Sequence, residues 1–332
     1  MKPLSILAAI LAAALLAGAQ APTYKYIRIG TAHDVTTKAS AGYALMGGGS
    51  DLDGAFRFLC AKGVGGDFLV LRAAGDDDYN DYIKGLCKTN SVATLIIPDR
   101  AAAHDPKVAD IIRHAEAVFI AGGDQSRCSN WWQGTPIQDA LNAHIADGKP
   151  IGGTSAGLAV LGEFIYSAQG DAPDDDDLKS VLALADPYMP PVTVRRNFLK
   201  IALLRNTLTD THFAERDRMG RTLTFLARIV QDDWSKNPRE IAVDGKSAVL
   251  IEPDGRLRVI GSGKGAYFLS VHEAPQVCRE KTPLTLGNIA VHHAPEGAEF
   301  NVRDWNGGGV VPYTLSVVDG KIQSTQAGGG VY

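Results

Sequence analysis

A serine flanked by glycines lies where the sequence changes from strand-like to helix-like. Residues 150–160 read Pro-Ile-Gly-Gly-Thr-Ser-Ala-Gly-Leu-Ala-Val, so Ser155 is the centre of a G-x-S-x-G motif. A strand, a sharp turn and a helix in this order expose the hydroxyl of the central serine at the carboxyl edge of a sheet. The N–H groups at the start of that helix would face an oxygen that turns negative beside Ser155. The motif predicts a nucleophile, while a tight turn in a nucleotide-binding sheet is the alternative.

The densest polar cluster of the chain spans residues 210–221 and reads Asp-Thr-His-Phe-Ala-Glu-Arg-Asp-Arg-Met-Gly-Arg. Histidine is the commonest general base, and arginine guanidinium groups bind carboxylates through two hydrogen bonds. His212 and the three arginines therefore predict a base next to a carboxylate-binding site. The alternative is a charged helix start with ion pairs three residues apart, such as Glu215 with Arg218. A separate run of aspartates at 174–177 is interpreted as an exposed surface segment.

A loop of small and polar residues, Gly122-Gly123-Asp124-Gln125, follows the apolar run 117–121. Ligands in open α/β sheets lie beyond the carboxyl ends of strands, so this loop and Ser155 are expected to edge one crevice. The glycines would let a backbone N–H approach a developing oxyanion, and Gln125 offers both a donor and an acceptor. A purely structural Gly-Gly turn is the alternative. Another run, Gly47-Gly48-Gly49, lacks the Lys-Ser/Thr of a phosphate loop and is interpreted as a strand-end turn near a site.

Strands that alternate with helices must position these motifs. Apolar runs at 67–71, 91–97 and 117–121 have the continuous hydrophobic character of parallel strands that are covered on both faces. The alternation of strands and helices predicts an α/β fold with a doubly wound, mostly parallel sheet. A hairpin at 241–260 and a glycine-rich tail predict a small C-terminal β appendage.

Composition divides the chain into three predicted segments. Residues 1–21 have a basic start, an apolar run and small residues at the end, as in a secretory signal peptide. An uncleaved membrane anchor is the alternative, although the apolar run is short for a bilayer. Residues 22–270 form the predicted main α/β domain, and 271–332 form the β-rich extension. We therefore expect a secreted or periplasmic protein that has no membrane contact after signal cleavage.

Charge and cysteine content exclude several kinds of partner. The formal net charge is −4, which gives no basic footprint for nucleic acid. Four cysteines in an exported chain allow two disulfides in three pairings. Cys60 with Cys87 is the first choice, because the two flank one strand-like segment. None of the cysteines has metal-ligand spacing, so neither a metal ion nor a cofactor is predicted.

Four separated motifs resemble, in order and approximate spacing, those of cyanophycinase and its relatives, the aspartyl dipeptidase family of serine peptidases. The motifs are Gly122–Gln125, Gly153–Gly157, the D-x-H-F-x-x-R-x-R-x-x-R pattern of 210–221 and the A-V-D-x-x-S-A pattern of 242–248. The resemblance covers about residues 44–269. It implies a fold like that of class I glutamine amidotransferases, with serine in place of the cysteine nucleophile. It also implies a homodimer and a peptide substrate.

The resemblance further implies roles for residues of this chain. Ser155 would be the nucleophile and His212 its base, and the backbone N–H groups of Gly123 and Ala156 would form the oxyanion hole. The residues that would contact an aspartyl substrate are Gln125, Asp210, Thr211, Arg216, Arg218 and Arg221. Among them, Asp210 would be available for a basic group such as an arginyl side chain, and Thr211 replaces the family's usual glutamine.

The third member of the expected triad departs from the family pattern. The family's I-D-E motif, whose glutamate resembles that third member, reads Val243-Asp244-Gly245 here. Glycine cannot orient an imidazole, so Asp244 is expected to take this role. The alternatives are another carboxylate, or a His212 that works more slowly without an acid partner.

These expectations converge on one function. The sequence predicts an exported serine exopeptidase or cyanophycinase-like hydrolase that cleaves aspartyl or β-aspartyl bonds, of the β-Asp-Arg type, through an acyl-enzyme on Ser155. The alternative is a catalytically inactive relative that binds aspartyl-type ligands. An amidotransferase-like glutaminase is disfavoured, because the motif carries serine and neither a cysteine nucleophile nor an ammonia-accepting domain is visible.

Overall fold

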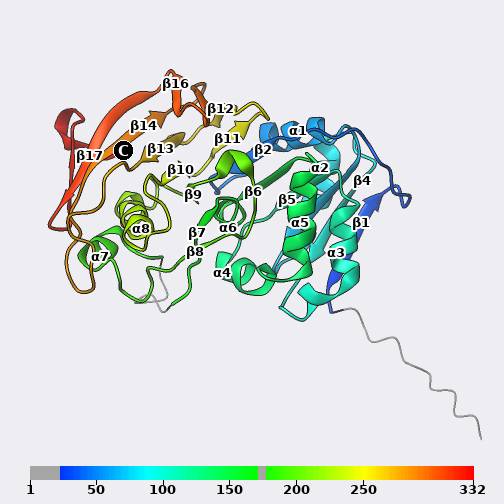
Figure 1. Ribbon diagram of the computed structural model, residues 1–332. Coiled ribbons are helices and arrows are strands. Elements are labelled where there is room, and N and C mark those ends of the chain that lie inside the picture. Colours follow the sequence, from blue (N-terminus) through cyan, green and yellow to red (C-terminus); the bar gives the residue numbers. More distant parts are fainter. Residues whose placement is uncertain (1–22, 171–176) are drawn as a thin grey trace, which may run out of the picture.

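The computed structural model describes residues 23–170 and 177–332, in which two β-sheets lie next to each other (Figure 1). The predicted signal peptide, residues 1–21, falls outside the described residues. The first sheet has ten strands, in the spatial order β1 (Lys25–Gly30), β4 (Ser91–Ile96), β3 (Asp67–Arg72), β5 (Ala117–Ile120), β6 (Ile151–Thr154), β2 (Tyr43–Met46), β11 (Ser247–Ile251), β12 (Arg256–Gly261), β15 (Glu299–Asn301) and β16 (Asn306–Gly308).

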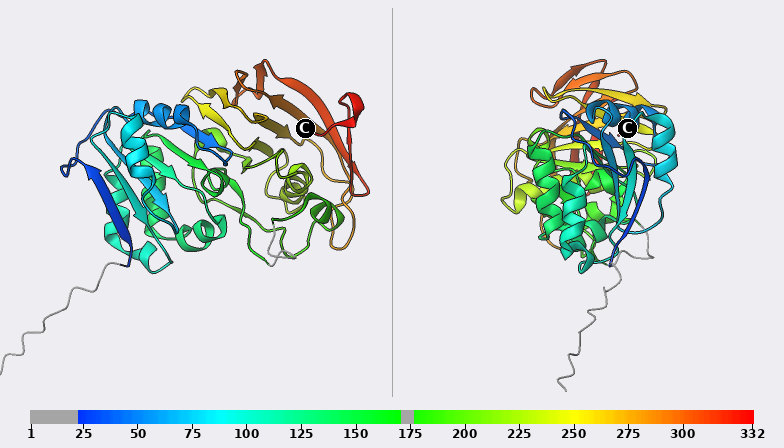
Figure 2. Two further views of the ribbon diagram at one scale, coloured as in Figure 1. Left: turned by 180° about the vertical axis from the view of Figure 1, so that it is seen from behind. Right: turned by 90° about the vertical axis from the view of Figure 1, so that its right-hand side faces the viewer.

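The centre of the first sheet is parallel and is covered on both faces. Strands β4, β3, β5, β6 and β2 pair in parallel, whereas β1 and β11 pair antiparallel with this centre. Successive side chains of a strand point to opposite faces, so Leu69 and Leu71 pack in one apolar cluster while Phe68 and Val70 pack in another. The first cluster includes helices α3 (Pro106–Arg113) and α5 (Pro136–Ala146), and the second includes α1 (Asp53–Lys62) and α2 (Tyr79–Leu86) (Figure 2).

The second sheet has eight mainly antiparallel strands. Their spatial order is β18 (Lys321–Ser324), β17 (Val311–Val318), β14 (Leu286–Ala294), β13 (Ala266–Ser270), β10 (Arg239–Val243), β9 (Thr207–Asp210), β7 (Phe164–Tyr166) and β8 (Val194–Arg196). Helix α8 (Met219–Gln231) packs on this sheet through an apolar cluster that joins Leu223 to Leu269 and Val291. Helix α7 (Ser180–Ala185) lies beside α8.

The α/β class is confirmed, but the strands are arranged differently from the one mostly parallel sheet that the sequence predicts. Residues beyond 270 do not form a separate appendage. Strands β14, β17 and β18 continue the second sheet from β13, and β15 and β16 continue the first sheet from β12. A strand edge exposes unpaired N–H and C=O groups, and the later strands pair with them. The choice of edge depends on the whole fold, and therefore no local sequence pattern reveals it.

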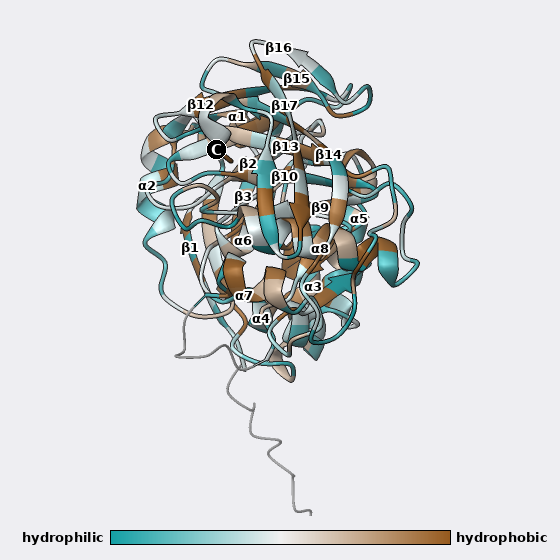
Figure 3. Ribbon diagram, turned by 90° about the vertical axis from the view of Figure 1, so that its left-hand side faces the viewer, coloured by the Kyte–Doolittle hydropathy of each residue, from teal (hydrophilic) through white to brown (hydrophobic). Residues whose placement is uncertain are grey.

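Apolar residues concentrate in the strands and helices, and the connecting loops are mainly hydrophilic (Figure 3). The predicted disulfide between Cys60 and Cys87 is confirmed, and it joins α1 to the residue after α2. Cys128 and Cys278 are free and buried. Within residues 23–170 and 177–332, no helix has the length and apolar character needed to cross a membrane. The remaining short helical segments are η1 (Ala102–His104), α4 (Gln125–Arg127), η2 (Cys128–Trp132), α6 (Ala156–Ala159), η4 (Ala202–Leu204) and η5 (Ala327–Gly329).

Candidate active site

Ser155 occupies a sharp turn between β6, which ends at Thr154, and α6, which begins at Ala156. Its backbone has φ 52° and ψ −121°, a conformation that residues other than glycine rarely adopt. The glycines of the motif permit this turn by close approach. A Cβ at Gly153 would lie 2.4 Å from the carbonyl carbon of Gly157, and a Cβ at Gly157 would lie 1.9 Å from the carbonyl oxygen of Ile120. The predicted strand, turn and helix are therefore present, with no room for larger neighbours.

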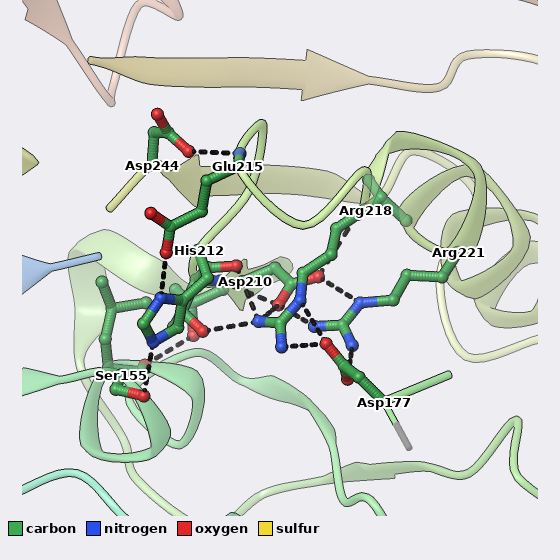
Figure 4. Close-up of polar contacts among 12 residues, drawn as sticks. Ser155, Asp177, Asp210, His212, Glu215, Arg218, Arg221 and Asp244 are labelled. Atoms are coloured by element: carbon green, nitrogen blue, oxygen red, sulfur yellow. Dashed lines mark hydrogen bonds and ion pairs between the residues drawn. The ribbon is translucent and has the colours of Figure 1, made fainter. Parts of the chain in front are cut away.

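His212 comes from the second sheet and meets Ser155 between the two sheets (Figure 4). It follows the end of β9, and its Nε2 lies 2.9 Å from Ser155 Oγ. The Gly47–Gly49 loop after β2 lies against the imidazole, since a Cβ at Gly48 would be 2.2 Å from Nε2. The N–H of His212 donates to the Gly47 carbonyl at 2.8 Å. The interpretation of this glycine run as a strand-end turn near a site is thereby confirmed.

The surroundings of His212 lower its pKa. Burial is the largest cause, because it penalises the charged imidazolium, and the positive charges of Arg216 and Arg218 act in the same direction. Contact with the Glu215 carboxylate opposes these effects without cancelling them. A neutral imidazole is the form that can accept a proton from a hydroxyl, so the ring is suited to work as a base at neutral pH.

The carboxylate that contacts His212 belongs to Glu215 and not to Asp244 (Figure 4). Glu215 Oε1 is hydrogen-bonded to His212 Nδ1. Asp244 is anchored to backbone instead, because its Oδ1 accepts the N–H groups of Ala214 at 2.8 Å and Glu215 at 2.9 Å. Its Oδ2 accepts the N–H of Lys264 at 3.0 Å. The expectation that Asp244 would contact the imidazole therefore fails, since a short side chain held by three backbone donors is turned away from the ring.

From the sequence, Glu215 is predicted only as an ion-pair partner for Arg218. The signal that could have identified it is its position three residues after His212, in a segment that turns tightly. The turn is closed by two hydrogen bonds, from the Arg216 N–H to the His212 carbonyl at 3.1 Å and from the Arg218 N–H to the Phe213 carbonyl at 3.0 Å. This turn brings the Glu215 side chain back toward the imidazole.

The Gly122–Gln125 loop edges the same site. It follows β5, the neighbour of β6, and a Cβ at Gly122 would lie 3.2 Å from Ser155 Cβ. The N–H groups of Gly123 and Ala156 donate no hydrogen bond to any residue within the described ranges, so both are available to an oxyanion. Gln125 is half-buried at the start of α4. The loop thus lies where the sequence places it, beside the serine.

Four of the predicted substrate-contacting residues are buried and paired within the protein (Figure 4). They are Asp210, Thr211, Arg218 and Arg221. Arg221 Nε donates to Asp210 Oδ2 at 2.9 Å, and Arg218 Nη1 donates to the carbonyl oxygen of Thr211 at 2.7 Å and to its hydroxyl at 2.8 Å. Both guanidinium groups also bind Asp177, with Arg218 Nε at 2.8 Å and Arg221 Nη1 at 2.6 Å from its carboxylate oxygens.

Asp177 is thus part of a buried network. The sequence predicts an exposed surface segment at 174–177, and for Asp177 this prediction is wrong. Residues 174–176 lie outside the described ranges. Burial raises the pKa of Asp177, but the charges of Arg221 and Arg218 outweigh burial and hold the pKa below its usual value. Arg216 differs from the other two arginines. Its side chain is exposed and forms no hydrogen bond or ion pair with the part of the chain that the structure describes.

Within the described residues, no group of three or more histidine, cysteine, aspartate or glutamate side chains is placed to hold a metal ion. The side chains at the site are instead a hydroxyl, an imidazole and a carboxylate in series. This arrangement can remove a proton from Ser155 and place it on His212.

Known proteins are similar to a large part of this chain. Cyanophycinase from Synechococcus elongatus is 29% identical over 234 residues, which are 68% of this chain and 64% of that protein, slightly less than two thirds of its length. Cyanophycinase from Geminocystis herdmanii (strain PCC 6308) is 26% identical over 216 residues, 62% of this chain and 70% of that protein. The model of peptidase family S51 matches residues 75–215. Over these segments the chain is therefore similar to peptidase family S51 and to the cyanophycinases.

The S51 match includes Ser155, His212 and Glu215, and it ends at Glu215. Asp244 and the arginines after Glu215 lie beyond this segment. The match to a solved structure of a peptidase from an acI-B1 actinobacterium covers 68% of this chain and 89% of that chain, with 16% identity and a TM-score of 0.47. That structural likeness is too distant to support an argument.

Proposed function

We propose that this protein is a serine peptidase of family S51, of the cyanophycinase kind, and that it forms an acyl-enzyme on Ser155. The observation that carries the proposal is the 2.9 Å contact between Ser155 Oγ and His212 Nε2 at a strained strand-to-helix turn. A serine hydroxyl is a weak nucleophile at neutral pH, and a neutral imidazole within hydrogen-bond reach activates it. The lowered pKa of His212 favours this neutral form.

In the proposed reaction, Ser155 Oγ attacks the carbonyl carbon of the scissile amide while its proton passes to His212 Nε2. The carbonyl π electrons move to oxygen, and the N–H groups of Gly123 and Ala156 donate to that oxyanion. When the tetrahedral intermediate collapses, the C–N bond breaks and the Nε2 proton passes to the leaving amine. Water then attacks the Ser155 ester with His212 again as base, which releases the acid product and restores the hydroxyl.

The proposed substrates are aspartyl or β-aspartyl peptides, with β-Asp-Arg as the type compound and exopeptidase cleavage as the reaction. Arg216 supports this choice because it is exposed and lies close enough to His212 to lower its pKa. A guanidinium at this position can bind a free aspartyl carboxylate through two hydrogen bonds. Gln125, at the other edge of the site, offers a donor and an acceptor to the peptide. The buried arginines would support the wall of the site from behind, since their hydrogen bonds are already engaged.

The proposal extends to location and assembly. We propose a secreted or periplasmic homodimer, without nucleic-acid partners and without a membrane contact after signal cleavage. The disulfide between Cys60 and Cys87 supports export, because such bonds persist in oxidising compartments. The homodimer rests on the resemblance to cyanophycinases.

The test of the function compares wild-type protein with Ser155→Ala on β-Asp-Arg, α-Asp-Leu and cyanophycin. The control is Ser40→Ala, since Ser40 is exposed and precedes β2 at the sheet edge opposite the site. We expect Ser155→Ala to abolish hydrolysis, and a fluorophosphonate probe to label the wild type and the control but not Ser155→Ala. Undiminished turnover by Ser155→Ala would refute the assignment of the nucleophile. Binding of β-Asp-Arg without labelling or turnover would support a catalytically inactive binding protein instead.

A further inference from the structure

Gly245 and the Glu215 carboxylate compete for one volume. A Cβ at Gly245 would lie 2.3 Å from Glu215 Oε2 and 2.5 Å from Glu215 Cδ. The φ of Gly245 is outside the left-handed region, so its backbone conformation does not require glycine. Any side chain at position 245 would displace the Glu215 carboxylate, which contacts His212. Space, and not backbone freedom, therefore accounts for glycine at this position.

We propose that Glu215 is the residue that positions His212, and that positions 215 and 245 are alternative origins for one carboxylate site. The inference rests on the proposed function only for its kinetic consequence. A Gly245→Glu side chain would have its own Cβ where the Cβ built on Gly245 lies. In a glutamate, Cβ and Cδ are about 2.5 Å apart, because two carbon–carbon bonds of about 1.5 Å meet near the tetrahedral angle. That separation equals the 2.5 Å between the Gly245 Cβ position and Glu215 Cδ, so either residue can place its carboxyl carbon at the same point.

Asp244 has a consistent role in this arrangement. Its Oδ1 accepts the N–H groups of Ala214 and Glu215, so it fixes the backbone from which the Glu215 side chain extends. Gly245 is the next residue after Asp244, so the position without a side chain lies against the same turn. Asp244 thus acts on His212 only through Glu215.

Glu215 would position His212 by fixing which ring nitrogen carries the proton. A carboxylate that accepts the Nδ1–H bond leaves the Nε2 lone pair directed at Ser155 Oγ, and it stabilises the imidazolium when Nε2 gains the proton. In Glu215→Gln the amide can donate to Nδ1, which favours the wrong tautomer. Replacement of the carboxylate in a serine–histidine–carboxylate series reduces kcat by a factor on the order of 10⁴.

The test uses four variants of the full chain and measures both catalysis and the ionisation of His212. The variants are Glu215→Gln, Glu215→Ala, Glu215→Ala combined with Gly245→Glu, and the control Glu296→Gln, which changes an exposed carboxylate that does not contact His212 or Glu215. We expect the first two to lower kcat by the factor given above with little change in KM. The double variant should recover at least tenfold of that loss relative to Glu215→Ala. The control should match the wild type.

The ionisation of His212 provides a readout that does not need turnover. Three charged groups from its own segment act on the ring, namely Glu215, Arg216 and Arg218. Ser155 and Gly48, which follow strands of the first sheet, also contact the ring, and neither of them carries a charge. Glu215 alone raises the pKa of His212, so we expect an NMR titration to show a lower His212 pKa in Glu215→Ala and a recovered value in the double variant. If Glu215→Ala kept both the wild-type kcat and the wild-type pKa, the positioning role would be overturned. If the folded double variant behaved like Glu215→Ala in both measurements, the exchange of positions would be overturned. If Ser155 failed to react with the fluorophosphonate probe in the wild type, the proposed function alone would fail.

Discussion

Glu240 offers a quantitative test of the buried network beneath the site. It lies on β10 and is fully buried, with its Oε1 2.9 Å from Thr222 Oγ1 and no hydrogen-bond partner for Oε2 among the described residues. Burial, followed by the negative charge of Asp210, raises the pKa of Glu240 well above its usual value. The Thr222 hydroxyl is also 3.5 Å from Asp210 Oδ2, so a protonated Glu240 can donate to Thr222, which in turn faces Asp210.

Charge balance, together with burial, favours the protonated form of this carboxyl. The two buried guanidinium groups of Arg218 and Arg221 are matched by the carboxylates of Asp177 and Asp210. An ionised Glu240 would add an unmatched negative charge to the interior, which costs far more than keeping a proton.

The perturbation is Glu240→Gln, which keeps the size of the side chain and removes its titration. The folded-state pKa of Glu240 is raised, so its contribution to stability is complete below the unfolded pKa and is lost as pH rises toward the folded pKa. The glutamine variant has no such loss. Its free energy of unfolding should therefore rise relative to the wild type by up to about 1.4 kcal/mol per pH unit between pH 5 and the folded pKa.

The assay is urea unfolding of both proteins at pH 5, 6, 7 and 8, with Glu296→Gln as the exposed control. The difference between Glu240→Gln and the wild type should grow with pH, and the control should differ from the wild type by a constant amount. A difference that stays constant for Glu240→Gln would show that Glu240 titrates normally in the folded protein, and the account of the network would be wrong.

Two further predictions concern His212. Because its pKa is lowered, the acid limb of kcat/KM against pH should have its midpoint below 6.5, the usual value for histidine; a midpoint above that value would contradict the assigned surroundings. Gly48→Ala should reduce kcat severely, since its Cβ would lie 2.2 Å from Nε2, whereas Gly148→Ala should not, because nothing lies within 4 Å of that position. Both glycines have positive φ, so each variant should lose about 1–2 kcal/mol of stability. If the two variants reduced kcat equally, the close packing of the Gly47–Gly49 loop on the imidazole would be refuted.

Local patterns were sufficient for the features that depend on neighbours in the sequence. The turn at Ser155 needs small residues on both sides because its backbone doubles back, and the sequence shows them at Gly153 and Gly157. The parallel strands at the centre of the first sheet are continuous apolar runs because helices cover both faces. The disulfide between Cys60 and Cys87 followed from one short strand-like segment between them.

Contacts between distant segments were beyond such patterns. Asp177 belongs to an acidic run that is typical of a solvated surface, yet it neutralises Arg218 and Arg221, which follow it by 41 and 44 residues. The strands after residue 270 extend two existing sheets, and nothing in their composition specifies the edges that they join. Both outcomes depend on which charges and which unpaired backbone groups the completed fold leaves to be satisfied.

The sequence alone identified a serine at a tight turn, a histidine as the candidate base and the order of the motifs around them, because each is encoded in a short run of residues. The tertiary structure decided which carboxylate meets the histidine. Asp244 and Glu215 are both acidic and both lie near His212. The choice between them depends on where three backbone N–H groups point and on the space that the missing side chain of Gly245 leaves for Glu215. A distance of a few ångströms separates an anchoring carboxylate from one that contacts the imidazole, and only the packed chain sets that distance.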